Sequence, residues 1–403
     1  MHYSLMKTVL VFLLCLAGVA HAAPGKKPKS VVPLQAAATQ VAKPEPVVEA
    51  KPAYPPAFKM VAAGNEHFVA LDKTGGLWVF GEDCFHCLGL GDENEILFLA
   101  GERMNRKLPE LLGTGFIFVT AHDAYTLAVK EDGTLWGWGR HVPGLEYQKD
   151  YLQPELISRI PIKEVYSGKG YALGVNKRGQ AWYFGRVFDP EPKNLYSPVP
   201  AHLWPVISLS ASPYHAAAVL NDKTAWTVGK DNRRGTLGKT PRQYSSESQI
   251  GGDNHVSVST GELFTQLNRE DGTSEFLGDM AYLKPYLGKI ISEKKNSLVV
   301  ETPYKSIVNY EEIPPGTGKF SVYLLKKDGD LDMIKLVITS GKAEIEPPVK
   351  VASGFSEVAG SYRQFIGLKS DGTIWVWGRS YKGLAGLKDK TEESDIPLPV
   401  EFR

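Results

Sequence analysis

This chain contains few cysteines, and its net charge is close to zero. Three cysteines in 403 residues are too few for a fold held together by disulfides. Lysine and arginine number 46 against 45 aspartates and glutamates, and within residues 58–403 the balance is 40 against 43, or about −3. Nucleic-acid binders carry an excess of positive charge that neutralises phosphates. The near-neutral balance therefore argues against a nucleic-acid partner.

The motifs of common active sites are also missing. The sequence contains no G-x-S-x-G, no glycine-rich phosphate loop, no HExxH and no His/Asp/Glu cluster at metal-ligand spacing. We therefore predict no catalytic residues, no cofactor and no metal, and a protein that is not an enzyme. A glycosidase-type carboxylate pair stays open, because sequence alone does not place two acidic side chains in space.

No apolar run is long enough to span a bilayer. Near the amino terminus, Lys7 precedes an apolar run from Val9 to Ala17, and Ala20-His21-Ala22 offers small residues where a signal peptidase would cleave. We expect residues 1–22 to be a signal peptide and the mature chain to have no transmembrane span. The protein should then be periplasmic or secreted.

Residues 23–57 differ in composition from the rest. Between Pro24 and Ala57 there are eight prolines, five lysines, seven alanines and one aromatic residue. Such a segment buries too little apolar surface to offset the entropy lost on ordering. We expect a disordered linker, either a plain spacer or a weakly basic tether to an anionic surface, ahead of one globular region at 58–403.

A pattern of about 49 residues repeats through this globular region. Each unit has an apolar run, a turn with Gly, Asp or Asn, and a second apolar run, as in FVALDKTGGLWVFG at 68–81 and FIGLKSDGTIWVWG at 365–378. Six units end on a glycine: Gly81, Gly139, Gly185, Gly229, Gly278 and Gly378. In five of them a tryptophan stands three residues earlier: Trp78, Trp136, Trp182, Trp226 and Trp375. A seventh unit, at 322–335, has neither residue.

Short strands joined by tight turns explain the pattern. Asp-Gly and Asn-rich turns tolerate positive φ and connect antiparallel strands. We expect the tryptophan to fill the wedge between neighbouring sheets, and the closing glycine to let two backbones approach closely. Three or four strands per unit, seven times over, predict an all-β fold, a seven-bladed β-propeller.

The units resemble the repeat of the regulator of chromosome condensation. Residues 61–92 read VAAGNEHFVALDKTGGLWVFGEDCFHCLGLGD, and residues 358–378 read VAGSYRQFIGLKSDGTIWVWG. The resemblance covers 58–403 and implies a propeller closed by pairing of the two chain ends, with Pro397–Phe402 meeting Phe58–Ala63. Family members include an exchange factor for a small GTPase and a secreted inhibitor of β-lactamases. Neither activity transfers to this chain residue by residue.

The family often has a histidine at the start of the first core strand. Here that register holds several residue types: His67, Tyr125, Tyr171, His215, Leu263, Ser321 and Gln364. Chemistry would require one residue type at this place. The mixture therefore predicts packing with occasional hydrogen bonds.

The segment DCFHCLG at 83–89 contains Cys84 and Cys87. Structural zinc takes four ligands, and there is no second cysteine pair. A thioredoxin-type site needs a helix N-terminus, whereas this pair follows an expected strand. An exported protein meets an oxidising compartment, so we favour a disulfide between Cys84 and Cys87. Two reduced, buried cysteines are the alternative.

Cations follow four of the closing glycines and would lie on one face of the ring. They are Arg140, Arg186, Lys230 and Arg379. With Phe85, His86 and Tyr147 from neighbouring loops, they form a candidate face for an anionic partner. A solvated rim, with the cations lying over aromatic rings, explains the same residues.

We therefore expect a monomeric, exported, non-catalytic propeller that binds another macromolecule, most readily a protein, through loops on one face. The alternatives are a polysaccharide-active lyase or hydrolase, an inhibitor of a secreted hydrolase, and an envelope-anchored structural protein. Export and near-neutral charge favour these classes over a nuclear exchange factor.

Overall fold

The structure is a computed structural model. It describes residues 55–91, 105–186, 197–229, 236–237, 245–250, 252, 254–261, 264–278, 283–294, 297–308, 318–339, 342–361, 363–380, 383–389 and 391–402. Residues 51–403 form one compact unit. The predicted signal peptide and linker residues 23–54 lie outside the described residues. Within the described ranges, no helix has the length and apolar character needed to cross a membrane.

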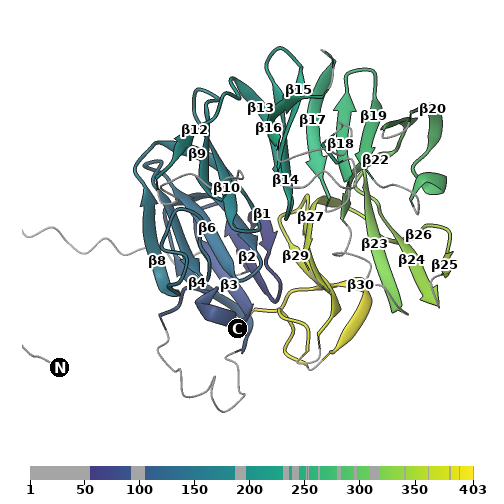
Figure 1. Ribbon diagram of the computed structural model, residues 1–403. Coiled ribbons are helices and arrows are strands. Elements are labelled where there is room, and N and C mark those ends of the chain that lie inside the picture. Colours follow the sequence, from purple (N-terminus) through teal and green to yellow (C-terminus); the bar gives the residue numbers. More distant parts are fainter. Residues whose placement is uncertain are drawn as a thin grey trace, which may run out of the picture. The chain divides into compact units, whose positions relative to one another are not determined.

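Seven antiparallel sheets, each built from strands consecutive in sequence, form the blades of a propeller (Figure 1). The predicted all-β, seven-bladed fold is confirmed. The innermost strands are β1 (Phe58–Ala63), β5 (Phe116–His122), β9 (Ile162–Gly168), β13 (Val206–Ala211), β17 (His255–Thr260), β22 (Tyr304–Val308) and β27 (Phe355–Ser361). The second strands are β2 (His67–Asp72), β6 (Tyr125–Lys130), β10 (Tyr171–Asn176), β14 (His215–Leu220), β18 (Phe264–Arg269), β23 (Gly318–Lys326) and β28 (Gln364–Lys369).

The outer half of each blade follows the same order along the chain. The third strands are β3 (Leu77–Glu82), β7 (Leu135–Gly139), β11 (Ala181–Gly185), β15 (Ala225–Gly229), β19 (Thr273–Gly278), β24 (Leu331–Thr339) and β29 (Ile374–Arg379). The strands paired next to them are β4 (Asn105–Gly113), β8 (Tyr151–Ser158), β12 (Val199–Pro200), β16 (Ser245–Gln249), β21 (Ser297–Glu301), β25 (Lys342–Ile345) and β30 (Glu393–Pro399). Blades 5 and 6 add β20 (Lys289–Lys294) and β26 (Val349–Ala352), and 3₁₀ turns form at Cys84–His86 and Lys284–Tyr286.

An aspartate fixes the turn between the second and third strands. In blade 2, Asp132 Oδ1 accepts hydrogen bonds from the backbone N–H and the hydroxyl of Thr134, at 2.9 and 2.6 Å. Trp136 Nε1 in turn donates to Thr134 Oγ1 at 2.7 Å. Blades 4 and 7 make the same set of bonds. The Asp-x-Thr-x-Trp order therefore closes the hairpin and orients the tryptophan.

Different tryptophans occupy different depths between the blades. Trp138 and Trp377, which follow two of the repeat tryptophans by two residues, are completely buried. Trp78 is also buried, whereas Trp136, Trp182, Trp226 and Trp375 are half-buried. The Lys130 ammonium covers the Trp136 ring at 4.3 Å from its centre. The second tryptophan of a pair fills the wedge more completely than the first.

The closing glycines lie where two backbones approach. A Cβ at Gly139 would be 2.3 Å from Ala124 O, and one at Gly378 would be 2.1 Å from Arg363 O. The same approach occurs at Gly81, Gly185 and Gly229, and Gly278 has a φ of +107°. The bend at Gly139 lets Arg140 N–H donate to Ala124 O at 2.9 Å. The glycine thus fixes where the residue after it leaves the sheet.

Blades 5 and 6 form although their repeats are the weakest. In blade 6, Lys335 takes the place of the closing glycine, and β23 pairs with β24 without interruption from Gly318 to Leu325. Loss of the glycine lengthens this hairpin instead of breaking it. In blade 5, β20 pairs with β21 and widens the sheet. Leu263, in the repeat register of blade 5, lies outside the described residues.

The first and last described parts of the propeller lie side by side, but no described strand pairs across the junction between blades 7 and 1. β30 pairs with β29, and β1 pairs with β2. The predicted pairing of Pro397–Phe402 with Phe58–Ala63 is therefore wrong, because each blade is completed by its own consecutive strands. Packing joins the ends instead. The Phe402 ring stacks on Phe58 with centroids 5.9 Å apart, and Phe58 N–H donates to Gly372 O at 2.8 Å.

The first residue of the second strand hydrogen-bonds to the next blade. His67 Nε2 lies 3.0 Å from Thr126 Oγ1 of blade 2, and that hydroxyl donates to Cys87 O at 3.0 Å. Because the hydroxyl proton is used in this way, the His67 ring N–H is the donor to Thr126. In blade 2, Tyr125 OH donates to Gly168 O of blade 3 at 2.5 Å. The prediction was packing with occasional hydrogen bonds, and these hydrogen bonds run between neighbouring blades.

Candidate functional site

The candidate face is the end of the blades at which the third strands stop. β7 ends at Gly139 and β11 at Gly185, and Arg140 and Arg186 follow. The turns from first to second strands lie at the same end, since Gly139 pairs with Tyr125 and Tyr125 with His122. We call this end the loop face.

Arg140 contacts an aromatic ring of the preceding blade. Its guanidinium carbon lies 4.2 Å from the centre of the Phe85 ring, and its Nε lies 3.7 Å from Asp150 Oδ1. Phe85 and His86 belong to a 3₁₀ turn of blade 1 and both have positive φ, at 56° and 62°. The arginine is therefore positioned across the junction of blades 1 and 2 by stacking and by an acidic neighbour.

Arg186 makes the same kind of contact one blade further on. Its guanidinium carbon lies 4.0 Å from the centre of the Tyr147 ring. The His141 ring lies 4.1 Å from the same centre and is tilted by only 7°. Because the Arg186 guanidinium and the His141 ring both lie this close to the centre of the Tyr147 ring, they must lie on its opposite faces. His141, Tyr147 and Arg186 therefore form a stack, which we call the cation–aromatic stack.

A cavity of about 250 Å³ opens beside this stack, between blades 2, 3 and 4. Its lining residues are Asp123, Tyr125, His141, Tyr147, Lys169, Gly170, Tyr171, Arg186, Pro213, Tyr214, Val228 and Gly229. Asp123 is the one acid among these lining residues, and its Oδ1 accepts from Asn65 Nδ2 at 2.6 Å. With Lys169 and Arg186 also in the wall, positive charge exceeds negative charge around the cavity.

Burial sets the protonation of several groups around the cavity. It lowers the pKa of His141, and the neighbouring charge of Arg140 lowers this pKa further, so the stacked ring is neutral at neutral pH. Burial raises the pKa of both Tyr125 and Tyr171. The Tyr171 hydroxyl donates to Ser212 O at 2.7 Å. The cavity therefore offers tyrosine rings as walls, together with the side chains of Lys169 and Arg186.

Cys84 and Cys87 are thiols in the structure, and no disulfide joins them. Cys84 Sγ donates to Glu66 Oε2 at 3.1 Å, and Cys87 Sγ donates to Glu82 O at 3.2 Å. Hydrogen bonds fix the turn without a bridge. Cys87 N–H donates to Cys84 O at 3.3 Å, and Cys87 O accepts from Trp138 Nε1 at 2.9 Å. The predicted disulfide is therefore wrong for this structure.

Glu66, Glu82 and Cys84 offer the one described group of potential metal ligands, with atoms within 4.8 Å of one another. A structural zinc site needs four such ligands. The Cys84 thiol donates to Glu66 Oε2. These three groups hold each other through hydrogen bonds and form an incomplete ligand set.

Of the two remaining predicted cations, only Arg379 lies within the described residues. Arg379 follows the closing glycine of blade 7, and its Nε lies 3.8 Å from Glu393 Oε2. Lys230 lies outside the described residues. Sequence reasoning missed His141, Lys169 and Tyr214, which stand at turns of three different blades. In the sequence, each of these residues lies beside a closing glycine or at the end of a strand. That position indicates that the residue lies on the loop face, but not that the three residues line one cavity.

Sequence comparisons find relatives that share part of this chain. No family model matches the sequence. The ultraviolet-B receptor UVR8 of Arabidopsis thaliana is 32% identical over 139 residues, or 30% of this chain and 30% of that protein. The probable E3 ubiquitin-protein ligase HERC6 of Homo sapiens is 26% identical over 209 residues, or 47% of this chain and 20% of that protein. The chain thus spans a third or less of the length of these relatives.

A third curated relative and two solved structures share the repeat or the fold. Protein RCC1 of Candida albicans is 24% identical over 152 residues, covering 33% of each protein. Human WBSCR16 superposes with a TM-score of 0.61 at 15% identity, over 82% of this chain and 94% of that one. Yeast RCC1 (Prp20), solved bound to Kap60, gives 0.50 at 18% identity over 85% and 75%. The chain is therefore a seven-bladed β-propeller, and part of it is similar in sequence to proteins that carry the regulator of chromosome condensation repeat.

Proposed function

We propose that the chain is an exported, non-catalytic propeller that binds a protein partner through the loop face of blades 1 to 4. It acts as a single propeller, outside the cytoplasm, after removal of residues 1–22. The partner presents an acidic segment that reaches the cavity beside the cation–aromatic stack. Support for a protein partner comes from yeast RCC1, a protein of this fold that was solved bound to Kap60.

The observation that carries this proposal is the position of Arg186. Its guanidinium stacks on the Tyr147 ring, and the same side chain also lines the cavity. Stacking restricts the side chain before binding, so less conformational entropy is lost when the arginine pairs with a carboxylate. Tyrosine and arginine are also the residue types that dominate the binding energy of protein interfaces.

A polysaccharide-active enzyme is a weaker candidate for this face. Hydrolysis of a glycoside uses two carboxyl groups about 5 to 10 Å apart. Asp123 is the one carboxylate among the described residues lining the cavity, and it already accepts a hydrogen bond from Asn65. The cavity therefore has the composition of a binding site for an acidic group.

Affinity capture with the mature protein tests the proposal directly. Immobilised residues 23–403 are incubated with an envelope extract, and retained proteins are quantified against two variants. Arg186→Glu should reduce the retained partner about tenfold or more, because it places a like charge against an acidic segment. Arg178→Glu is the matched control, since Arg178 is an exposed arginine of the same blade that lies in the turn at the opposite end.

Two results would contradict the proposal. One is equal capture of the partner by the wild type and by Arg186→Glu, when circular dichroism shows that both proteins are folded. The other is capture of glycan with no enriched protein. Tyr147→Leu separates stacking from charge, because it keeps Arg186 and removes the ring that positions it, and it should give an intermediate loss.

A further inference from the structure

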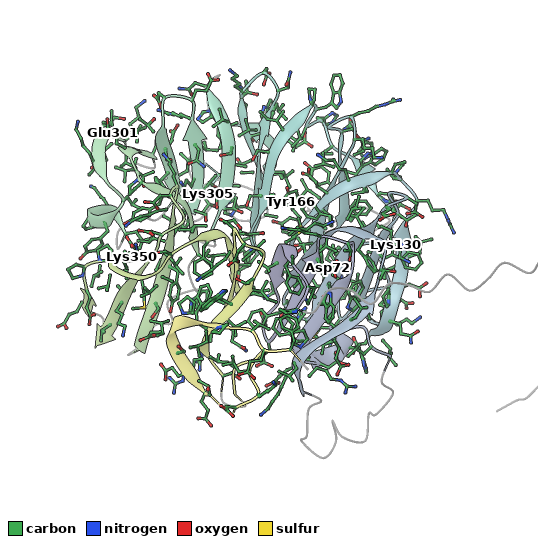
Figure 2. The ribbon with its side chains drawn as sticks, turned by 180° about the vertical axis from the view of Figure 1, so that it is seen from behind. Asp72, Lys130, Tyr166, Glu301, Lys305 and Lys350 are labelled. Atoms are coloured by element: carbon green, nitrogen blue, oxygen red, sulfur yellow. The ribbon has the colours of Figure 1, made fainter. Side chains whose placement is uncertain are left out.

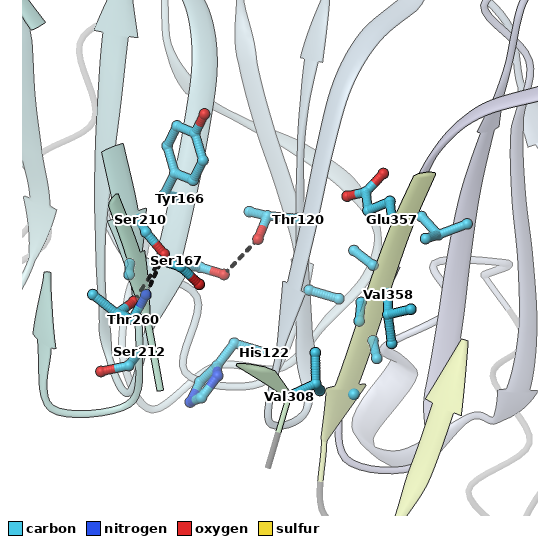
Figure 3. Close-up of a pocket in the computed structure, with 18 of the residues that line it drawn as sticks. Thr120, His122, Tyr166, Ser167, Ser210, Ser212, Thr260, Val308, Glu357 and Val358 are labelled. Atoms are coloured by element: carbon cyan, nitrogen blue, oxygen red, sulfur yellow. Dashed lines mark hydrogen bonds between the residues drawn. The ribbon is translucent and has the colours of Figure 1, made fainter. Parts of the chain in front are cut away.

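The innermost strands of all seven blades line a central cavity of about 340 Å³ (Figure 3). Small-molecule sites in proteins have volumes of about 300 to 1,000 Å³. A cavity of this size holds about ten water molecules, or one compact ligand of about a dozen non-hydrogen atoms. It is separate from the cation–aromatic stack, whose three residues do not line it.

The lining from blades 1, 2 and 3 combines apolar and aromatic side chains with the linked hydroxyls of Thr120 and Ser167, which lie 2.9 Å apart. Met60, Phe118 and Tyr166 come from blades 1, 2 and 3. The rings of Phe118 and Tyr166 contact each other edge to face, with centroids 5.4 Å apart. The Tyr166 hydroxyl donates to Glu164 Oε2 at 3.1 Å, so its oxygen keeps lone pairs that accept. This side, which we call the aromatic wall, offers carbon surface with a polar edge.

The other wall carries hydroxyl groups and one carboxyl group. Ser210, Thr260, Ser306 and Glu357 come from blades 4 to 7 and line the same cavity. The hydroxyls of Ser210 and Thr260 are linked at 2.9 Å. Figure 3 shows the Glu357 carboxyl group reaching from β27 into the cavity, at the end where Tyr166 lies and away from Ser212. We call this side the polar wall.

The charges around the cavity disfavour a charged occupant. Burial raises the pKa of Glu357 to about 7, against the opposing effects of the Val61 backbone N–H and the Lys305 charge. Lys305 is exposed on β22, where its Nζ donates to Ser356 O at 2.9 Å (Figure 2). An anionic ligand would be repelled by the Glu357 carboxylate, and a cationic ligand would be attracted by Glu357 but repelled by Lys305. A neutral ligand meets neither penalty.

We propose that the central cavity is a binding site for a neutral polyhydroxylated molecule of monosaccharide size. A pyranose has an apolar C–H face that fits the aromatic wall and a rim of hydroxyls that fits the polar wall. Glu357 accepts two sugar hydroxyls, while Ser306 and the linked pair Ser210 and Thr260 donate and accept around them. The site is independent of the loop face and of the protein partner proposed above.

Saturation-transfer NMR with the full chain tests this site. The probes are D-glucose, D-galactose and N-acetyl-D-glucosamine, with ethanolamine as a cationic comparison. At least one sugar should show transfer, and titration should give a Kd that rises about tenfold in Glu357→Gln, which removes a charged acceptor. Ala62→Leu, which adds a side chain into the cavity lining, should abolish the transfer.

Control variants make the result specific to the cavity. Glu131→Gln removes an exposed carboxylate from a hairpin turn of blade 2 and should leave sugar binding unchanged. Arg186→Glu should leave it unchanged too, which separates this site from the loop face. Absence of transfer from all three sugars would overturn the proposal. So would equal affinity in Glu357→Gln, or stronger binding of ethanolamine than of any sugar.

Discussion

Single glycines determine where the loop-face arginines stand. Gly139 has a φ of +94°, and its α-carbon faces the carbonyl oxygen of Ala124. The bend directs Arg140 N–H to that oxygen, so the arginine leaves the sheet at a fixed point. A side chain at Gly139 would push the second and third strands apart and move Arg140 away from Phe85.

Gly139→Ala should therefore cost more than about 2 kcal/mol in the free energy of unfolding, because a clash adds to backbone strain. Gly170→Ala is the matched control. Gly170 also has a positive φ, of +73°, but a Cβ there meets nothing within 4 Å. It should cost about 1 kcal/mol from backbone strain alone. Urea denaturation measures both, and equal losses would refute the role of the close approach.

At the level of residues, the sequence predicted positions better than contacts. Arg140 and Arg186 each follow a closing glycine, and each stands directly after the end of a third strand. Their aromatic partners Phe85 and Tyr147 lie in loops of the preceding blade, and no spacing encodes that contact. The cysteine prediction was wrong for the same reason, because the thiols bond to Glu66 and to the Glu82 backbone of the surrounding strands.

Between blades, a repeated hydrogen-bond chain joins one sheet to the next. In blade 4, His215 Nε2 lies 2.8 Å from Thr265 Oγ1, and that hydroxyl donates to Thr236 O at 2.9 Å. The arrangement matches that of His67 and Thr126 in blades 1 and 2. In both places the imidazole is enclosed and donates to a neutral hydroxyl. A protonated ring would place an uncompensated charge in the junction.

Stability should consequently fall in mild acid. Burial lowers the pKa of His67 to about 3 and that of His215 to about 4. The folded pKa is depressed, so below about pH 6.5 the unfolded chain binds protons that the folded chain does not. Each histidine should contribute a loss of about 2 kcal/mol between pH 7 and pH 5. Urea unfolding across this range measures the sum.

Variants separate the histidines from other titrating groups. Glu357 acts in the opposite sense, because its raised pKa of about 7 favours the folded state as the pH falls. The informative quantity is therefore the difference between the wild type and His67→Gln, which should change by about 2 kcal/mol from pH 7 to pH 5. His202→Gln, at an exposed position, should leave the pH profile unchanged. An unchanged profile in His67→Gln would refute the argument.

Individual strands were predictable where turn chemistry marks them. The Asp-Gly turns located the central hairpins, even in blades 5 and 6. The fifth strand β20 and the long hairpin of blade 6 were not predicted. Lys335 in place of glycine removes the bend that normally ends the third strand, so pairing continues to Ile338. The repeat pattern shows that blade 6 lacks the closing glycine. How far the pairing then extends depends on the length of the facing strand β23.

At the scale of the whole ring, closure uses a backbone contact that also joins other neighbouring blades. Phe58 N–H donates to Gly372 O across the closure, as Ile162 N–H donates to Gly133 O between blades 2 and 3, at 2.8 and 2.9 Å. Seven blades follow from the repeat count. The mode of closure does not, because the last strand could complete blade 7 or pair with β1, and only the folded register of β30 on β29 decides.

A ring closed without strand pairing should open first at the junction of blades 7 and 1, which no connecting segment of chain bridges. Phe402 stacks on Phe58 and meets Trp78 edge to face at 6.0 Å, and this aromatic group caps the apolar core between blades 7 and 1. Phe402→Ala should cost about 2 kcal/mol, because it removes a half-buried ring. Hydrogen exchange should rise in β1 to β4 and in β27 to β30, and stay unchanged elsewhere.

Tyr286→Ala removes a half-buried ring beside the core of blades 5 and 6, where the chain is continuous, so its effect should stay local. Faster exchange throughout the ring in both variants would mean that the closure is no weaker than the other junctions.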